Sequence, residues 1–408
     1  MERYGLLGEH LSHSLSPQIH AFFGDYAYDL IEKPEEALAD FFAQPPYRAI
    51  NVTIPYKKTV IPYCTELDDV AKRIGSVNTI RFDGEAVRGY NTDYYGFSYM
   101  LERAGITVTN KKVLVLGSGG ASATVCCVLE DLQAAEVVVI SRTGEHNYSN
   151  LDRHRDAEVI VNTTPVGMFP HTGATPISLA QFPACEAVAD LIYNPLRTRL
   201  LQEADARGLK TANGLAMLVA QGHRAAELFF DESLDKALIE TGLRGLENAF
   251  RNVVLVGMPG SGKSTQARLL AEALGKQAVD IDAAVEQAAG VTIPTIFAEQ
   301  GEAAFRRLEA ETVQELGRQS GKVIATGGGA ILTAQNREAL RQNAVVVWLK
   351  RELDALATGG RPLSKDREAL ERLWQEREPL YRAAADVAVT VSGSPEDTCR
   401  QILEAINR

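Results

Sequence analysis

Two glycine-rich loops constrain the fold of this chain more than any other feature of its sequence. Residues 117–122 follow the apolar run 113–116, and residues 257–264 follow the apolar run 253–256. Each loop lies between a short β-branched stretch and a segment with helical periodicity. A strand that turns through glycines into a helix is typical of nucleotide sites in α/β proteins. Two such units predict an α/β fold throughout, with two separate nucleotide sites.

Length and composition indicate a soluble chain of several domains. The 408 residues exceed one ordinary core, and 45% hydrophobic and 23% charged residues are typical of globular proteins. The sequence shows neither an apolar run of roughly 18 residues nor a signal peptide. Five cysteines without metal-type spacing favour a reducing, cytoplasmic location. The net charge of −11 argues against nucleic acid, so we expect small-molecule partners and no membrane.

The pattern around the two loops predicts three domains. Candidate strands before the second loop lie at residues 49–54, 77–82, 136–140 and 158–161. An amphipathic helix is expected over about 215–230. Two glycines within 241–248 indicate a domain junction, interpreted as a short connection. We expect α/β domains over 1–95, 96–213 and 250–408, the last of them a P-loop domain with a parallel sheet.

The first loop resembles a dinucleotide fingerprint with one departure. Gly117 and Gly119 occupy the first two glycine positions, but the third position holds Ser122. Alone, this pattern fits a plain tight turn as well as nucleotide binding. The next strand ends in Arg142 instead of the acidic residue of an NAD site, and a guanidinium suits the 2′-phosphate of NADP. The alternative is that Arg142 is a solvated surface residue.

Six ordered motifs around this loop resemble the shikimate dehydrogenase family over about residues 1–245. They are Leu11-Ser-His-Ser-Leu-Ser-Pro17, Asn51-Val-Thr-Ile-Pro-Tyr-Lys57, Gly75-Ser-Val-Asn-Thr79, Asn91-Thr-Asp93, Asn162-Thr-Thr-Pro-Val-Gly-Met168 and Gly214-Leu-Ala-Met-Leu-Val-Ala-Gln221. Any one motif could be accidental, whereas all six in this order are specific. The resemblance implies NADP-dependent interconversion of 3-dehydroshikimate and shikimate. It also implies that residues 1–95 form a substrate-binding domain, which is completed by a helix at about 214–245, and that residues 96–213 form a Rossmann-like NADP domain.

The same resemblance implies roles for individual residues. Ser14 and Ser16 would bind the shikimate carboxylate, and Tyr193 would lie near the substrate. The ring hydroxyls would be lined by Thr53, Lys57, Asn78, Asp93 and Gln221. NADP would be held by Gly117, Ser118, Gly119, Gly120, Ala121, Ser141, Arg142, Thr143, Leu191 and Gly214.

Ketone reduction gives Lys57 and Asp93 a chemical purpose. The reaction needs a hydride from the nicotinamide and a proton donor at the developing alkoxide. Lys57 can supply that proton, and Asp93 can position its ammonium group. The alternative is a surface ion pair of little energetic value. His13 and His20 lie near these motifs but show neither metal spacing nor a triad partner, so we expect them to be structural.

The second loop, residues 257–264, matches the G-x-x-x-x-G-K-[ST] pattern completely. Backbone amides of such a loop surround the phosphates, Lys263 reaches the β- and γ-phosphate oxygens, and the Ser264 hydroxyl can ligate Mg²⁺. A glycine turn followed by an accidental Lys-Ser is the alternative. The predicted ATP-binding residues are Gly260, Ser261, Gly262, Lys263, Ser264 and Thr265.

The C-terminal part resembles the shikimate kinase family over about residues 252–408. The matching motifs are Asp280-Ile-Asp282, Gly301-Glu-Ala-Ala-Phe-Arg306-Arg-Leu-Glu309, Thr326-Gly-Gly-Gly329, Arg361-Pro-Leu363 and Arg377-Glu-Pro-Leu-Tyr381. By this resemblance Asp282 accepts the proton of the acceptor hydroxyl, and Asp280 helps Ser264 to hold Mg²⁺. The shikimate ring would contact Gly328, and its carboxylate would be bound by Arg306 and Arg377.

The expected lid of this kinase departs from the family pattern. Family lids carry an additional arginine several residues before Arg-Pro-Leu, but residues 356–360 contain none. Arg361 would therefore contact ATP and carry more of the stabilisation of charge on the transferring phosphoryl group. Lys263 would reach that group only from the loop side.

Together these motifs predict a bifunctional enzyme of chorismate and aromatic amino acid biosynthesis, which uses NADPH, ATP and Mg²⁺. The first part would reduce 3-dehydroshikimate to shikimate, and the second would form shikimate 3-phosphate. One rival is an NAD-dependent quinate/shikimate-type dehydrogenase joined to a kinase of another small alcohol, against which Arg142 and the paired arginines argue. The other rival keeps one half as a non-catalytic ligand-sensing or scaffold module. The intact Lys57, Asp93, Lys263 and Asp282 argue against it, but the altered lid leaves it open for the kinase half.

Overall fold

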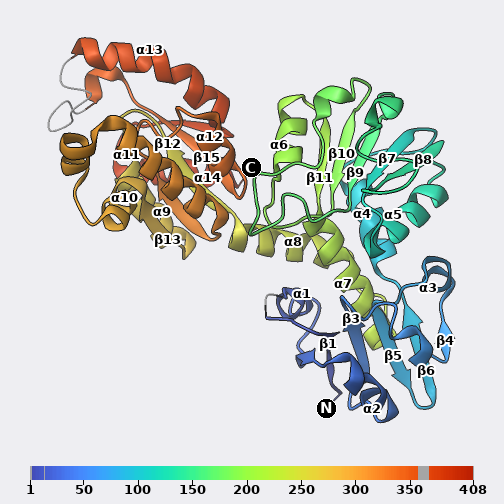
Figure 1. Cartoon of the computed structure of the whole chain (residues 1–408). Helices are drawn as coiled ribbons and strands as arrows, with labels where there is room; N and C mark the ends of the chain where they lie inside the picture. Colours follow the sequence, from blue (N-terminus) through green and yellow to red (C-terminus); the bar gives the residue numbers. More distant parts are fainter. Residues whose placement is uncertain (1, 13, 357–366, 408) are drawn as a thin grey trace. The chain divides into compact units, whose positions relative to one another are not determined.

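Three β-sheets organise the chain, and each is flanked by helices (Figure 1). The structure is a computed structural model that describes residues 2–12, 14–356 and 367–407. Two compact units are present: one contains residues 1–168, 174–193 and 200–246, and the other contains 169–173, 194–199 and 247–408. The predicted α/β class is confirmed. Among the described residues, no helix is long and apolar enough to span a membrane.

The first sheet is mixed and has the strand order β2-β1-β3-β5-β6-β4. Its strands are β1 (Tyr4–Gly8), β2 (Tyr28–Glu32), β3 (Ala49–Val52), β4 (Glu66–Leu67), β5 (Thr79–Asp83) and β6 (Ala86–Tyr90). Parallel pairing joins β1 to β2 and β3, whereas β5 pairs antiparallel with β3 and β6. Every residue of β1 and β3 is buried, because helices cover the sheet.

Helices that are distant in sequence complete this first domain. They are α1 (Ser16–His20), α2 (Leu38–Ala43), α3 (Asp69–Ile74), α4 (Asp93–Arg103) and α7 (Gly214–Phe230). Although α7 follows the second sheet in the chain, it packs against α1, α4, β3 and β5. The amphipathic helix expected over about 215–230 therefore supplies part of the first domain's core.

The second sheet is entirely parallel, with the order β11-β10-β9-β7-β8. Its strands are β7 (Lys112–Leu116), β8 (Glu136–Ile140), β9 (Val159–Asn162), β10 (Ala187–Asp190) and β11 (Lys210–Asn213). Helix α5 (Gly120–Asp131) packs on β7 and β8. Helix α6 (Arg199–Ala206) provides Leu200 and Leu201, which belong to the same hydrophobic core as strand side chains such as Leu114. The loops after the parallel strands therefore meet at one edge of the sheet.

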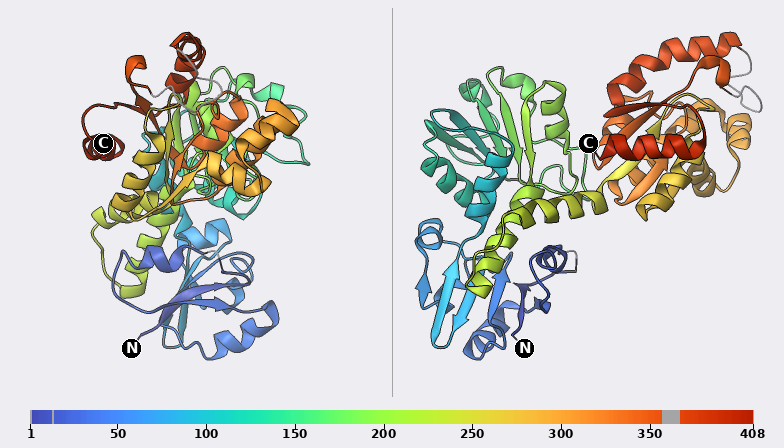
Figure 2. Two further views of the ribbon diagram at one scale, coloured as in Figure 1. Left: turned by 90° about the vertical axis from the view of Figure 1, so that its left-hand side faces the viewer. Right: turned by 180° about the vertical axis from the view of Figure 1, so that it is seen from behind.

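The third sheet is also parallel, with the order β13-β14-β12-β15-β16. Its strands are β12 (Asn252–Val256), β13 (Gln277–Asp280), β14 (Lys322–Ala325), β15 (Ala344–Lys350) and β16 (Val387–Thr390). Val253 and Leu255 pack towards α9 (Lys263–Leu274) and α14 (Pro395–Ile406). Val254 and Val256 face the opposite core, which is covered by α10 (Ile281–Ala289), α11 (Ile293–Arg318), α12 (Ala334–Arg341) and α13 (Arg367–Ala384) (Figure 2).

The segment 241–248, expected to be a short connection, lies inside helix α8 (Ala237–Phe250). Its glycines serve close packing instead of a turn. A methyl group on Gly245 would lie 2.5 Å from Cζ of Phe22, and one on Gly242 would lie 3.5 Å from the same ring. Gly242 and Gly245 therefore leave room for the Phe22 side chain. The two units divide between Leu246 and Glu247, within the segment predicted as the junction, but the chain there is helical and not a turn.

Candidate active sites

Lys57 and Asp93 form a close ion pair in the first unit. Lys57 lies beyond the end of β3, and Asp93 is the first residue of α4. Their Nζ and Oδ2 atoms are 2.6 Å apart, with 28% and 17% of the side chains exposed. The pair is thus partly shielded from water but still reachable by a small molecule. An ammonium group fixed in this way can donate a proton to a bound carbonyl oxygen.

A network of buried side chains lies next to Asp93. Asn78 Nδ2 donates to Thr92 Oγ1 at 3.0 Å, while the Thr92 amide donates to Asn78 Oδ1 at 2.7 Å. Thr92 Oγ1 is also 3.3 Å from Gln221 Oε1. The structure therefore brings Asn78, Asp93 and Gln221 together from three elements. Thr92 was not predicted as a site residue, although its place between Asn91 and Asp93 in a quoted motif was a usable signal.

Ser14 and Ser16 lie together at the start of α1. The Ser14 hydroxyl donates to Ser16 Oγ at 3.2 Å and accepts from the Ser16 amide at 3.2 Å. His20, in the same helix, stacks on Tyr28 with ring centroids 4.1 Å apart. Burial lowers the pKa of His20 to about 3, so this imidazole stays neutral and structural. His13 lies outside the described residues.

Thr53 lies near the carboxyl ends of β1 and β3. Its amide donates to Leu7 O at 2.9 Å, and its methyl group would be 2.8 Å from a side chain placed on Gly8. Thr53 follows β3 by one residue and precedes Lys57 in the same loop. The loop after β3 thus supplies two of the predicted substrate-binding residues.

The loop after β7 leaves open space at the N-terminus of α5. Helix α5 begins at Gly120, and its N-cap Gly119 provides no side-chain hydrogen bond. A methyl group on Gly119 or Gly120 would meet no atom within 4 Å, whereas one on Gly117 would lie 2.8 Å from Thr163 Oγ1. Free backbone amides beside open space fit the pyrophosphate of a dinucleotide. Ser118 and Ala121 belong to the same loop.

Arg142 is exposed beyond the end of β8. Around it the chain folds back, because the Ser141 amide donates to His146 O at 3.2 Å and the Ser141 hydroxyl donates to Thr143 O. Within the described part of the chain, the Arg142 guanidinium has no ion pair or hydrogen bond. The Arg142 guanidinium is therefore available to bind an anionic group from solvent.

Leu191 and Gly214 are adjacent where β10 and β11 end. The Gly214 amide donates to Ile192 O at 3.0 Å. A methyl group on Gly214 would overlap the Leu191 carbonyl, so this position requires glycine. Tyr193 follows directly, and burial raises its pKa. The predicted cofactor residues from three loops thus lie at the carboxyl edge of the second sheet.

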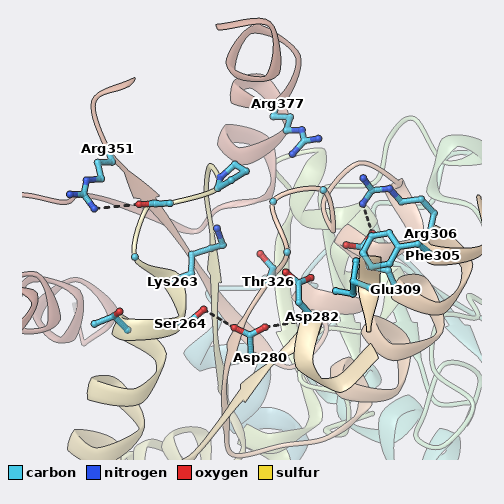
Figure 3. A pocket seen from close by; sticks show the side chains of 18 of the residues that line it. Lys263, Ser264, Asp280, Asp282, Phe305, Arg306, Glu309, Thr326, Arg351 and Arg377 are labelled. Atoms are coloured by element: carbon cyan, nitrogen blue, oxygen red, sulfur yellow. Dashed lines mark hydrogen bonds and ion pairs between the residues drawn. The ribbon is translucent and has the colours of Figure 1, made fainter. Parts of the chain in front are cut away.

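The second unit contains a cavity of about 540 Å³ beside its P-loop (Figure 3). Most predicted kinase residues line this cavity. The lining comprises Pro259, Gly260, Gly262, Lys263, Ser264, Thr265, Asp280, Asp282, Ile293, Phe297, Phe305, Arg306, Glu309, Thr326, Gly327, Gly328, Gly329, Arg351 and Arg377. Ser261 belongs to the same loop but is buried behind it. Arg361 lies outside the described residues.

Lys263 is the first residue of α9 and is only 8% exposed. Its Nζ donates to Gly257 O at 2.9 Å and to Met258 O at 3.0 Å, which ties the side chain to its own loop. A methyl group on Gly262 would meet no atom within 4 Å, so the loop leaves open space before the helix. A cation and free helical amides at one point fit a polyphosphate.

Asp280 is the last residue of β13, and its carboxylate forms hydrogen bonds to residues of both α9 and α10. Its Oδ2 accepts from the Ser264 hydroxyl at 2.6 Å, and its Oδ1 accepts from the Asp282 amide at 3.0 Å. Hydroxyl and carboxylate oxygens are suitable Mg²⁺ ligands. Among the described residues, no group of three or more His, Cys, Asp or Glu could hold a metal ion. Ser264 and Asp280 therefore fit an ion that is shared with phosphate oxygens and water.

Asp282 lies in the first turn of α10 and faces the cavity (Figure 3). Burial and then the charge of Asp280 raise the pKa of Asp282, while Lys263 and Arg306 lower it in part. A carboxylate whose ionised form is disfavoured is a stronger base than an exposed one. The arrangement therefore suits proton acceptance from a hydroxyl.

Arg306 and Arg377 flank the glycine turn after β14. Arg306 Nη1 pairs with Glu309 Oε2 at 2.8 Å, and a methyl group on Gly329 would overlap this guanidinium. A methyl group on Gly328 would lie 3.2 Å from Arg377 Nη1. Within the described residues, the buried Nε atoms of both arginines have no hydrogen-bond partner. Two guanidinium groups with unused donors fit a small carboxylate.

Glu309 and Arg351 were not predicted as site residues. Glu309 is 1% exposed and fixes Arg306, and its position three residues later in the quoted motif was a usable signal. Arg351 follows β15, outside every quoted motif, so the sequence carried no signal for it.

Comparisons with known proteins identify both parts of the chain. A sequence profile described as "Shikimate dehydrogenase substrate binding domain" matches residues 6–80, and one described as "Shikimate kinase" matches residues 259–407. A shikimate dehydrogenase (NADP(+)) of Clostridium perfringens (strain SM101 / Type A) is 38% identical over 261 residues, which are 59% of this chain and 96% of that protein.

Solved structures agree for the first unit. A chorismate mutase/shikimate 5-dehydrogenase fusion protein from Clostridium acetobutylicum has a TM-score of 0.58 and 35% identity, covering 60% of this chain and 97% of that one. A shikimate 5-dehydrogenase from Thermus thermophilus, in complex with NADP(H) and shikimate, has a TM-score of 0.55 and 34% identity, covering 60% and 99%. The chain therefore belongs to the shikimate dehydrogenase family in its N-terminal part and carries a shikimate kinase domain in its C-terminal part.

Proposed function

We propose that the chain catalyses two consecutive steps of the shikimate pathway. Its first unit reduces 3-dehydroshikimate to shikimate with NADPH, and its second unit transfers the γ-phosphoryl group of ATP to shikimate, forming shikimate 3-phosphate. The observation that carries the proposal is that one chain resembles both enzymes, in its N-terminal and C-terminal parts respectively. The product of the first site is then the substrate of the second.

In the reductive step, Lys57 donates a proton to the oxygen of the reacting carbonyl. Asp93, 2.6 Å away, holds the ammonium group in place. When bound, NADPH supplies the hydride. Ser14 and Ser16 bind the carboxylate, while Thr53, Asn78 and Gln221 line the hydroxyl groups.

The cofactor residues of the first unit bind two different anionic groups of NADP, the pyrophosphate and the 2′-phosphate. The amides around Gly119 and Gly120 face the pyrophosphate, and Arg142 binds the 2′-phosphate with its planar fork. Leu191 and Gly214 lie at the same edge of the sheet. The Clostridium perfringens relative, named for NADP(+), supports this choice of dinucleotide.

In the phosphoryl transfer, Asp282 accepts the proton of the acceptor hydroxyl. Arg306 and Arg377 bind the shikimate carboxylate, and the glycine turn at Gly328 contacts the ring. Lys263 neutralises charge on the transferring group from the loop side. Ser264 and Asp280 would hold Mg²⁺ when it binds with ATP, and the ion would neutralise negative charge on the phosphate groups.

Separate assays of the two half-reactions test the proposal. Purified chain should oxidise NADPH only when 3-dehydroshikimate is added, and it should form ADP only when shikimate and Mg²⁺ are added. Lys57→Ala should impair the first assay alone, and Asp282→Asn the second alone. Folded protein that fails either half-reaction contradicts bifunctionality.

A further inference from the structure

We propose that Arg351 binds the phosphate chain of ATP and so replaces, from the end of β15, a cation that the adjoining segment lacks. The inference rests on the proposed kinase function and extends it by one residue. Residues 352–360 contain no arginine, so Arg351 and Arg361 are the arginines at either end of that stretch. Arg351 is the one within the described residues.

Arg351 lies at the nucleotide end of the cavity. It follows β15 (Ala344–Lys350), which pairs in parallel with the P-loop strand β12, so both strands deliver their next residues to one edge. Its Nη1 donates to Gly260 O at 3.3 Å. Figure 3 shows Arg351 and Arg306 on opposite sides of the cavity, with Lys263 and Asp282 between them. Arg306 and Arg377 occupy the acceptor side, which leaves Arg351 beside the nucleotide.

The contacts of Arg351 leave its charge available. Its hydrogen bond goes to a neutral carbonyl and is long. Within residues 2–12, 14–356 and 367–407, the Arg351 guanidinium forms no ion pair, whereas Arg306 pairs with Glu302 and Glu309. A guanidinium that lines the cavity without a carboxylate partner can attract an anion that enters the cavity.

The neighbouring cation is used differently. Lys350 Nζ lies 4.4 Å from the centre of the Trp348 ring, a cation–π contact on the strand itself. Lys350 is therefore engaged with the sheet, while Arg351 is directed to Gly260. A polyphosphate bound along the P-loop passes next to Gly260, where the planar fork of a guanidinium can bind two phosphate oxygens at once.

Calorimetric titration of the full chain tests this assignment. Arg351→Ala should weaken ADP binding about tenfold, as expected for a charged contact that is partly screened by water. Pyrophosphate, which has no base, should lose affinity by a similar factor. Arg351→Lys should recover part of the loss, since an ammonium keeps the charge but not the fork. Arg400→Ala, at an arginine with 69% of its side chain exposed, serves as the matched control.

The outcomes separate this inference from the proposed function. Equal ADP affinities in the wild type and Arg351→Ala would overturn the role of Arg351 while leaving the kinase proposal intact. Loss of ADP affinity with unchanged pyrophosphate affinity would mean a contact to the base, which also overturns the phosphate assignment. A folded wild-type chain that binds no ADP would overturn both proposals.

Discussion

The two glycine-rich loops look alike in sequence but provide charge in different ways. The loop after β7 has no charged side chain, and its candidate cation, Arg142, is exposed beyond the end of the next strand, β8. The loop after β12 ends in Lys263, which is 8% exposed and bound to the loop's own carbonyls. A loop that holds a cofactor without reacting with its phosphates can bind them with backbone amides, and the cation can come from another loop. A loop at which phosphate bonds change needs a fixed charge at the reacting group.

The acidic residues of the two proposed sites also differ in their surroundings. Asp93 in the first unit is paired with Lys57, whereas Asp282 in the second has burial and Asp280 against its ionised form. Substitutions in the second site should therefore cause larger losses than substitutions in the first unit. Four variants test this order.

The largest effect is expected for Asp282→Asn. Removing a general base should lower kinase kcat by about 10²–10⁴-fold, with reductase activity unchanged. Because the pKa of Asp282 is raised, its ionised form opposes folding, and this cost grows as pH rises from the unfolded pKa through the folded one. At pH 7 the variant should therefore melt at a higher temperature than the wild type.

The pH dependence provides a second readout for Asp282. The difference in melting temperature should shrink as pH falls and should vanish well below the ordinary aspartate pKa of about 3.9, where Asp282 is protonated in both states. The acid limb of kinase kcat/KM should lie above that value. A variant that keeps most of its kinase rate, or that melts lower at pH 7, would remove Asp282 from this role.

Arg361 should matter almost as much, although it lies outside the described residues and this expectation rests on sequence. Arg361→Ala should lower kinase kcat by about 10²–10³-fold, the range for losing one preorganised donor, with shikimate affinity little changed. Arg361→Lys should recover only part of the rate. A near-normal kcat in steady-state kinetics of the alanine variant would show that Arg361 is a surface residue.

Lys57→Ala should lower reductase kcat by on the order of a hundredfold, because it removes the proton donor. Kinase activity and melting temperature should hardly move, since the pair is partly exposed and contributes little to stability. Lys58→Ala, at the exposed neighbouring lysine, is the control and should leave both activities unchanged. If Lys57→Ala retains its reductase rate, the proton comes from elsewhere.

The smallest effect is expected for Arg142→Ala. It should weaken NADPH binding by about 1.5–3 kcal/mol, the range for a hydrogen bond to a charged group, and leave NADH binding nearly unchanged. Fluorescence titration with both dinucleotides measures the difference. Equal losses for the two cofactors would show that Arg142 has a packing role. They would contradict the claim that Arg142 supplies the positive charge for the dinucleotide.

Much of the fold could be predicted because local patterns agreed with tertiary packing. The strand at 136–140 and the helix from about 215 carry clear periodicity, and the structure has β8 at Glu136–Ile140 and α7 from Gly214. The segment 241–248 could not be read locally, because its glycines are needed by Phe22, over 200 residues earlier in the chain. Arg351 was missed for a related reason, since only the pairing of β12 with β15 brings it to Gly260.

One coupled assay tests bifunctionality most directly. Purified chain is mixed with 3-dehydroshikimate, NADPH, ATP and Mg²⁺, and NADPH oxidation and shikimate 3-phosphate are followed together. We predict that both occur and that the phosphorylated product accounts for the NADPH consumed once shikimate has been used. With Asp282→Asn, NADPH oxidation should continue while shikimate accumulates. NADPH oxidation by the wild type without any shikimate 3-phosphate would contradict the account.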